Sequence, residues 1–175
     1  MCSSDLPTIM SGTDQELFNL AMSEESRPLM YAVQKHITEN VAPITEEFFA
    51  LNDEKEDRWT WHPRQTELLE GAKAKAKESG LWNFFLPDAE TGQGLNNLDY
   101  AYIAAELGKY SLASETLNCS APDTGNMEVL ERYGSEAQKK EWLEPLLEGK
   151  IRSAFAMTEP GVASSDATNI CTSAV

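Results

Sequence analysis

The amino-acid sequence predicts an all-α domain followed by the first strand of a β domain. Up to Gly149, apolar residues recur with helical spacing in several separate segments. From Ile151 to Met157 the residues are mostly apolar without a helical stripe, and Gly149 and Pro160 bound them, as is typical of a strand. With 175 residues, 41% of them hydrophobic, the chain can bury a core of its own.

The clearest helical pattern follows Pro28, a residue suited to a first helical turn. Pro43 lies inside this pattern and lacks a backbone donor, so a kink is expected between Glu39 and Pro43. The apolar residues of the pattern lie four, four, three and four positions apart and are Val33, Ile37, Val41, Ile44 and Phe48.

Four further helices are expected before the strand. Ser135 and Gln138 form a capping box at the start of the last one, in which Trp142 is expected to face inward with three leucines. The apolar stretch LWNFFLP, residues 81–87, is predicted to be a buried extended connection. The expected helices run from Pro63 to Gly80, from Leu98 through Ala105, from Met127 to Tyr133, and from Ser135 to Gly149.

These elements divide the chain into three parts. Residues 26–149 are predicted to form the helical domain, and residues 150–175 the truncated start of the β domain. Residues 1–25 are poorly defined by pattern, although Leu17, Leu20 and Ala21 fit one face of a short helix. Residues 1–6 match the translation of a common sequencing-library primer and are interpreted as an artefact.

Composition and charge argue against several classes of protein. A formal charge of -15 disfavours binding to nucleic acid or anionic lipid, and no apolar run is long enough to span a membrane. The scattered Cys2, Cys119 and Cys171 fit a reducing compartment and predict no metal site. Since no targeting pattern is visible, a cytoplasmic location is predicted, or a mitochondrial or peroxisomal one in a eukaryote.

The stretch FAMTEPGVASSD, which begins at Phe155, combines the expected strand with a turn rich in small hydroxyl side chains. Such a turn can hold a phosphate or the polar edge of a planar ring. Serine-rich turns after strands are also common without any ligand. The residues alone therefore leave both interpretations open.

Two motifs in their order give the chain a resemblance to the acyl-CoA dehydrogenase family. The segment RYGSEAQKKEWLEPLLEGK, followed by FAMTEPGVASSD, is similar to the end of that family's helical N-terminal domain and its first barrel strand. The resemblance runs from about Leu29 to Ile170 and is greatest to the branch fused in animals to a phosphotransferase-like domain. It implies the fold of that N-terminal domain, followed by one strand of an incomplete β-barrel.

The resemblance also implies a flavin site for FAD. Phe155 and Met157 would lie beside the isoalloxazine ring, Thr158 would donate to its N5 and carbonyl edge, and Ser164 and Ser165 would reach the pyrophosphate. Relative to the family's commoner TEPGAGSD, this chain has one more residue between Pro160 and the final serine, which puts the role of Ser164 in doubt.

Substrate contacts are implied at two places. Ser165 would touch the acyl-CoA substrate, and the stretch from Leu117 to Gly125 would line the acyl tunnel through Ser120 and Asp123. For Ser120 and Asp123, capping of the helix at Met127 explains the same residues equally well.

The implied reaction is α,β-dehydrogenation of an acyl-CoA thioester, with an electron-transfer flavoprotein as the acceptor and a homodimer or homotetramer as the assembly. The family's catalytic glutamate belongs to a later helical domain, so no catalytic residue is expected in this chain, and Glu159 is expected to pair locally. The chain alone is therefore expected to be inactive. A non-enzymatic helical interaction module, or a related flavoenzyme such as an acyl-CoA oxidase or a nitroalkane-oxidase-like protein, is the alternative.

Overall fold

The computed structural model describes residues 20–173 except 56, 58 and 90, so the expectations for residues 1–19, including Leu17, lie outside the described part. None of the helices in that part is long and apolar enough to cross a bilayer. The helices are α2 (Arg27–His36), the π-helical turn η1 (Ile37–Val41), α3 (Ala42–Ala50), the 3-10 turn η2 (Leu51–Glu54), α4 (Pro63–Glu78), α5 (Asn97–Leu107), α6 (Ala113–Thr116), α7 (Asp123–Tyr133), α8 (Glu136–Gln138), the π-helical turn η3 (Lys139–Leu143), α9 (Glu144–Leu147) and the 3-10 turn η4 (Ala167–Asn169).

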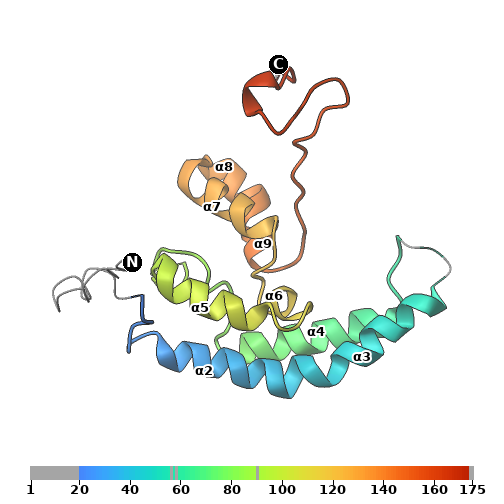
Figure 1. The fold of residues 1–175 in the computed structure, drawn as a ribbon, viewed down its shortest axis with the longest axis vertical. Coiled ribbons are helices and arrows are strands. Elements are labelled where there is room, and N and C mark those ends of the chain that lie inside the picture. Colours follow the sequence, from blue (N-terminus) through green and yellow to red (C-terminus); the bar gives the residue numbers. More distant parts are fainter. Residues whose placement is uncertain (1–19, 56, 58, 90, 174–175) are drawn as a thin grey trace, which may run out of the picture.

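The helices are arranged in two levels (Figure 1). α2, η1 and α3 form one long helical run at the base, α4 and α5 pack on it, and α7 to α9 form the second level beneath the C-terminal segment. One apolar core joins the two levels. Burial of its side chains is favourable because it removes them from water. Its fully buried members include Val33, Val41, Phe84, Leu86, Ile103, Leu117 and Met127. The all-α prediction is confirmed.

Both π-helical turns end two residues before a proline. η1 ends at Val41 before Pro43, and η3 ends at Leu143 before Pro145. A proline inside a helix lacks the N–H that would bond four residues back, and its ring crowds that carbonyl group. A wider π turn accommodates both defects. The irregularity predicted between Glu39 and Pro43 is therefore present, and it takes the form of a local widening of the helix.

The predicted starts and faces of the later helices are confirmed in part. Ser135 Oγ accepts a hydrogen bond from the Gln138 amide at 3.3 Å, and Gln138 Oε1 accepts one from the Ser135 amide at 2.9 Å, so the capping box is present. α7 begins at Asp123, four residues before the predicted start. Trp142 is 44% exposed and was wrongly placed in the core, since the π turn offsets the regular helical spacing.

The LWNFFLP stretch is buried, as predicted, but it is folded into turns instead of being extended. Leu81, Phe84, Phe85 and Leu86 are all buried, and Asn83 has a φ of 58°. Asn83 reaches this left-handed conformation at a modest cost because its short side chain forms local hydrogen bonds. The resulting turn packs four apolar side chains into a small space.

The predicted strand from Ile151 to Met157 is wrong for this structure. The described residues contain no strand, and residues 152–159 run without regular pairing. A strand needs a neighbour to accept and donate its backbone hydrogen bonds, and no neighbouring strand lies among the described residues. The segment instead extends away from the helices (Figure 1).

A buried pair of asparagine side chains holds the end of α9. Asn118 Nδ2 donates to Asn83 Oδ1 at 2.7 Å and to the Leu146 carbonyl at 3.0 Å, while Asn83 Nδ2 donates to the Leu147 carbonyl at 2.8 Å. The Trp82 indole donates to the same Leu147 carbonyl at 2.7 Å. The last carbonyl groups of a helix have no partner within the helix. Here side chains from two other segments satisfy them.

We expect Asn118→Ala to lower the free energy of unfolding by about 1–3 kcal/mol, because it leaves Asn83 Oδ1 without a donor and removes one of the two donors to the Leu146 carbonyl. Urea denaturation of the 175-residue chain measures this change. Asn97→Ala, at an exposed position of α5, is the matched control and should change stability by less than about 0.5 kcal/mol. Equal effects of the two substitutions would contradict the role given to Asn118.

Candidate functional site

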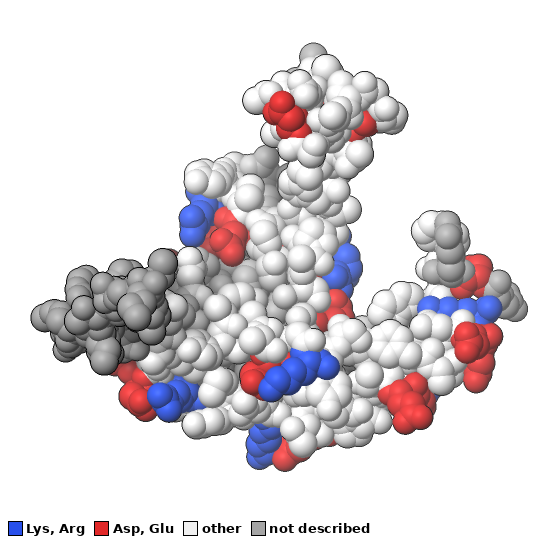
Figure 2. Space-filling view, viewed as in Figure 1, with Lys and Arg blue, Asp and Glu red and all other residues white. Residues whose placement is uncertain are grey.

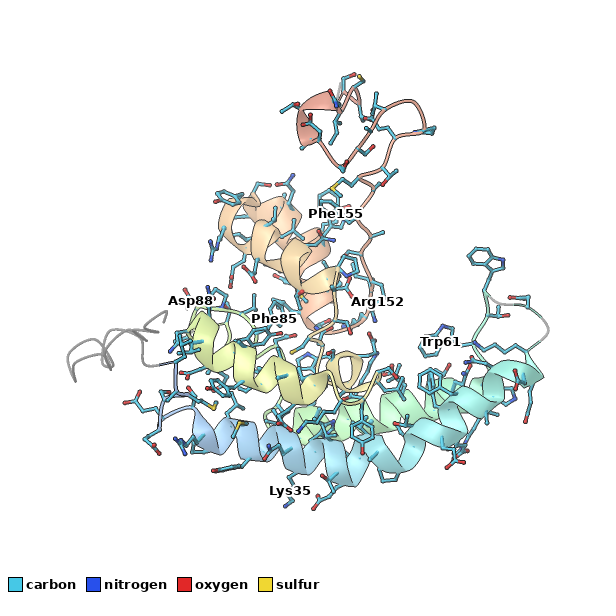
Figure 3. The ribbon with its side chains drawn as sticks, viewed as in Figure 1. Lys35, Trp61, Phe85, Asp88, Arg152 and Phe155 are labelled. Carbon is cyan, nitrogen blue, oxygen red and sulfur yellow. The ribbon has the colours of Figure 1, made fainter. Side chains whose placement is uncertain are left out.

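The residues predicted to face the cofactor lie on the segment that leaves the helical body after Gly149 (Figure 3). Phe155 is 69% exposed and Met157 is 50% exposed, and Thr158 is also exposed. Within the described part of the chain, the Thr158 hydroxyl and the backbone groups of residues 154–158 form no hydrogen bond. Two large apolar side chains and a row of free donors and acceptors are thus presented to solvent together.

Beyond Thr158, one carboxylate closes the loop of residues 159–172. Glu159 accepts hydrogen bonds from the Cys171 amide at 3.0 Å, the Thr172 amide at 2.8 Å and the Thr172 hydroxyl. The Thr172 hydroxyl and these amides favour the charged carboxylate and hold the pKa of Glu159 below its usual range. Glu159 therefore pairs locally in this structure.

The two serines of this loop have different surroundings. Ser164 is half-buried, and its hydroxyl accepts a hydrogen bond from the Glu159 amide at 2.8 Å. Ser165 is exposed. The hydroxyl of Ser164 thus already has a structural partner, whereas that of Ser165 is accessible from solvent.

Ser120 lies at a different place, on an open cavity of about 670 Å³ that it lines together with Arg152, Ser153 and Lys73. The cavity adjoins the root of the C-terminal segment but is not lined by any residue from Phe155 to Ser165. The structure thus brings together the five predicted cofactor residues on one segment and places Ser120 apart from them.

Asp123 neither caps α7 nor lines this cavity. The N-cap position of α7 is Pro122, and no side chain caps the helix. The Asp123 carboxylate instead accepts hydrogen bonds from the Ser153 amide at 2.7 Å and the Ser153 hydroxyl at 2.6 Å, and pairs with Arg152 Nε at 2.5 Å. Capping of α7 by Asp123 is therefore wrong, and its carboxylate contacts the C-terminal segment instead, while its place along an acyl tunnel stays a prediction.

Four charged residues form an alternating series beside the cavity. Asp123 pairs with Arg152, Arg152 with Glu115, and Glu115 with Lys73 at 3.0 Å. The series connects α7, the C-terminal segment, α6 and α4. The sequence carried no signal for these contacts, because their members are separated by up to 79 positions and show no periodic relation.

The exposed segment has the chemistry required of one wall of a flavin site. Its apolar side chains can cover a planar ring, and its unpaired amides and the Thr158 hydroxyl can bond a polar ring edge. Residues 153–175 include no lysine or arginine, so this segment itself offers a phosphate only amides and hydroxyls. Figure 2 shows this part of the surface as largely uncharged, with acidic residues only. The described residues contain no cluster of potential metal ligands.

Comparisons with known proteins give a consistent result. The sequence model described as "Acyl-CoA dehydrogenase, N-terminal domain" matches residues 23–150. Acyl-CoA dehydrogenase family member 11 of Gallus gallus is 49% identical over 166 residues, which cover 93% of this chain and 20% of that protein. Acyl-CoA dehydrogenase family member 10 of Mus musculus is 49% identical over 154 residues, 85% of this chain and 14% of that protein. This chain thus spans at most about one fifth of the length of these relatives.

A solved structure is also similar. It is described as that of a "putative acyl-CoA dehydrogenase" from Mycobacterium abscessus and superposes with a TM-score of 0.76. The sequence identity is 49%, and the match covers 85% of this chain and 38% of the other.

The loop closure by Glu159 predicts a pH dependence. Because the pKa is lowered in the folded chain, the closed loop is stabilised above the ordinary carboxyl pKa of 4.5 and loses that stabilisation as the pH falls through the lowered value. An NMR titration of the Glu159 side chain should give a midpoint below 4.5, and Thr172→Val should raise it. A midpoint at or above 4.5 in the unsubstituted chain would contradict the closure.

Proposed function

The chain belongs to the acyl-CoA dehydrogenase family, and we propose that it forms the helical N-terminal domain of a flavin-dependent enzyme of that family, together with the segment that faces FAD. The proposed reaction is the α,β-dehydrogenation of an acyl-CoA thioester. The proposed acceptor is an electron-transfer flavoprotein, and the proposed assembly is a homodimer or homotetramer.

One observation carries the proposal. The segment with the family's TEP motif projects from the helices with its apolar side chains exposed and its backbone groups unpaired. Such a segment is unfavourable in water unless another surface covers it. A flavin ring together with further β strands would cover both its apolar and its polar groups.

Each residue of the segment has a proposed task. Phe155 and Met157 pack or present their backbone groups beside the ring, and the Thr158 hydroxyl donates to the polar ring edge. Ser165 and the nearby amides bind the pyrophosphate, while Ser164 holds the loop through Glu159. The bound flavin supplies the hydride acceptor. Ser165 and Ser120 are proposed to contact the acyl-CoA substrate.

A chimera tests this proposal. Residues 23–173 of this chain would replace the matching part of the Mycobacterium abscessus protein, with that protein itself as the reference. We expect the chimera to be purified with flavin and to reduce an electron acceptor with an acyl-CoA, and we expect the 175-residue chain alone to be colourless. A well-folded chimera without flavin, beside a yellow reference protein, would favour a helical interaction module instead.

Thr158→Val in that chimera keeps the volume of the side chain but removes its hydroxyl donor. A neutral hydrogen bond contributes about 0.5–1.5 kcal/mol, which corresponds to about 10–30 mV for a two-electron couple. We expect a shift of that size in the flavin potential and slower flavin reduction. Thr168→Val, ten positions along and bonded to Asp166, is the control and should leave the potential unchanged. An unchanged potential in Thr158→Val would remove Thr158 from the flavin site.

A further inference from the structure

The buried carboxylate of Asp123 is directed entirely at the root of the C-terminal segment. Asp123 is 2% exposed, and the hydrogen bonds that it accepts come from Arg152 and Ser153, 29 and 30 positions along the chain. Asn126 Nδ2 strengthens the contact by donating to Ser153 Oγ at 2.8 Å. A buried carboxylate is costly unless it is well paired, so these contacts hold the segment firmly.

The charges around Asp123 argue against a ligand at this place. Arg152 is paired with both Asp123 and Glu115, and Lys73 is paired with Glu115 and Glu70. Two cations thus face three carboxylates, and an anionic group such as a phosphate would be repelled. The carboxylate of Asp123 therefore binds groups of the chain itself, at Arg152 and Ser153, and not a ligand.

The anchoring of Ser153 by Asp123 also determines to which side the following side chains point. In an extended segment successive side chains point to opposite sides, so Ser153, Phe155 and Met157 share one side while Ala154 and Thr158 share the other. A shift of one residue would exchange the two sides. With the Ser153 amide and hydroxyl both fixed on Asp123, only one of the two arrangements is compatible with the anchor.

We propose that Asp123 is a positioning residue that sets the register of the segment from Ala154 to Thr158, and thereby the side chains presented to the cofactor. The naming of the cofactor rests on the function proposed above. The setting of the register does not, because it acts within the helical domain and can be measured in the chain without flavin.

Hydrogen exchange at the Ser153 amide is the first measurement. In the 175-residue chain this amide should exchange slowly, and Asp123→Asn should accelerate it about ten- to hundredfold, because it replaces a charged acceptor by a weaker neutral one and removes the ion pair with Arg152. Asp166→Asn removes a carboxylate that bonds only residues within the distal loop and is the matched control, with no change expected at Ser153.

A paramagnetic label reports the register itself. With Cys2 and Cys171 replaced by serine, a label is attached at Ala154→Cys or, separately, at Phe155→Cys. Burial raises the pKa of Cys119 to about 12, so its thiol is not labelled. Ala154 lines a groove with Val129 and Leu130, so its label should broaden those two amides more than the label at position 155 does. In Asp123→Asn this difference should disappear.

If Asp123 only stabilised the fold, Asp123→Asn would lower the urea midpoint of unfolding. The difference between the two labels would then persist in the molecules that remain folded. If Asp123→Asn does not fold, Ser153→Ala removes the hydroxyl donor and Arg152→Met removes the guanidinium donor, and each should weaken the difference. A label difference that persists in every folded variant would overturn the proposal. If the chimera binds no flavin, the inference about Asp123 is unaffected. If Asp123→Asn leaves the difference between the two labels unchanged, the inference is wrong even in a protein that binds flavin.

Discussion

Hydrogen bonds from the Asn118 and Asn83 side chains hold the end of α9, where the chain leaves the helical domain. They join three segments that are distant in sequence and satisfy the buried carbonyl groups of Leu146 and Leu147. The Leu146 carbonyl also accepts from the Gly149 amide at 3.0 Å, whereas the Leu147 carbonyl is bonded by the Trp82 and Asn83 side chains, so the end of α9 is held by its own turn and by these side chains together. The point at which the chain leaves the helical domain is thereby fixed.

The exit from the domain follows from that fixed helix end. Gly149 has a φ of 72°, and a Cβ there would lie 2.8 Å from the Trp82 ring, so both its conformation and its surroundings require glycine. Four residues later Asp123 holds Ser153. The helical domain therefore determines the position, direction and register of a segment that it does not itself cover. A segment that one domain positions but does not cover fits the proposal that other parts of a longer protein complete the site.

Helices were largely predictable from the sequence, because spacings such as those from Val33 to Phe48 reflect burial on one face of a helix. The strand was not, since a strand exists only with a partner, and Phe155 remains exposed here. The motif located the candidate site on one segment, although no periodic pattern could reveal that Asp123 meets Arg152 across thirty residues. Trp142 was misplaced because a π turn interrupts the regular period.

We infer that the helical domain folds by itself and presents an uncovered segment. Hydrogen exchange across the whole 175-residue chain tests this inference. We expect amides in the core, such as those of Val33 and Ile103, to exchange only on global unfolding, and those of residues 155–157 to exchange nearly as fast as in a free peptide. Strong protection of residues 155–157 in the monomeric chain, or fast exchange at Val33 and Ile103, would contradict it.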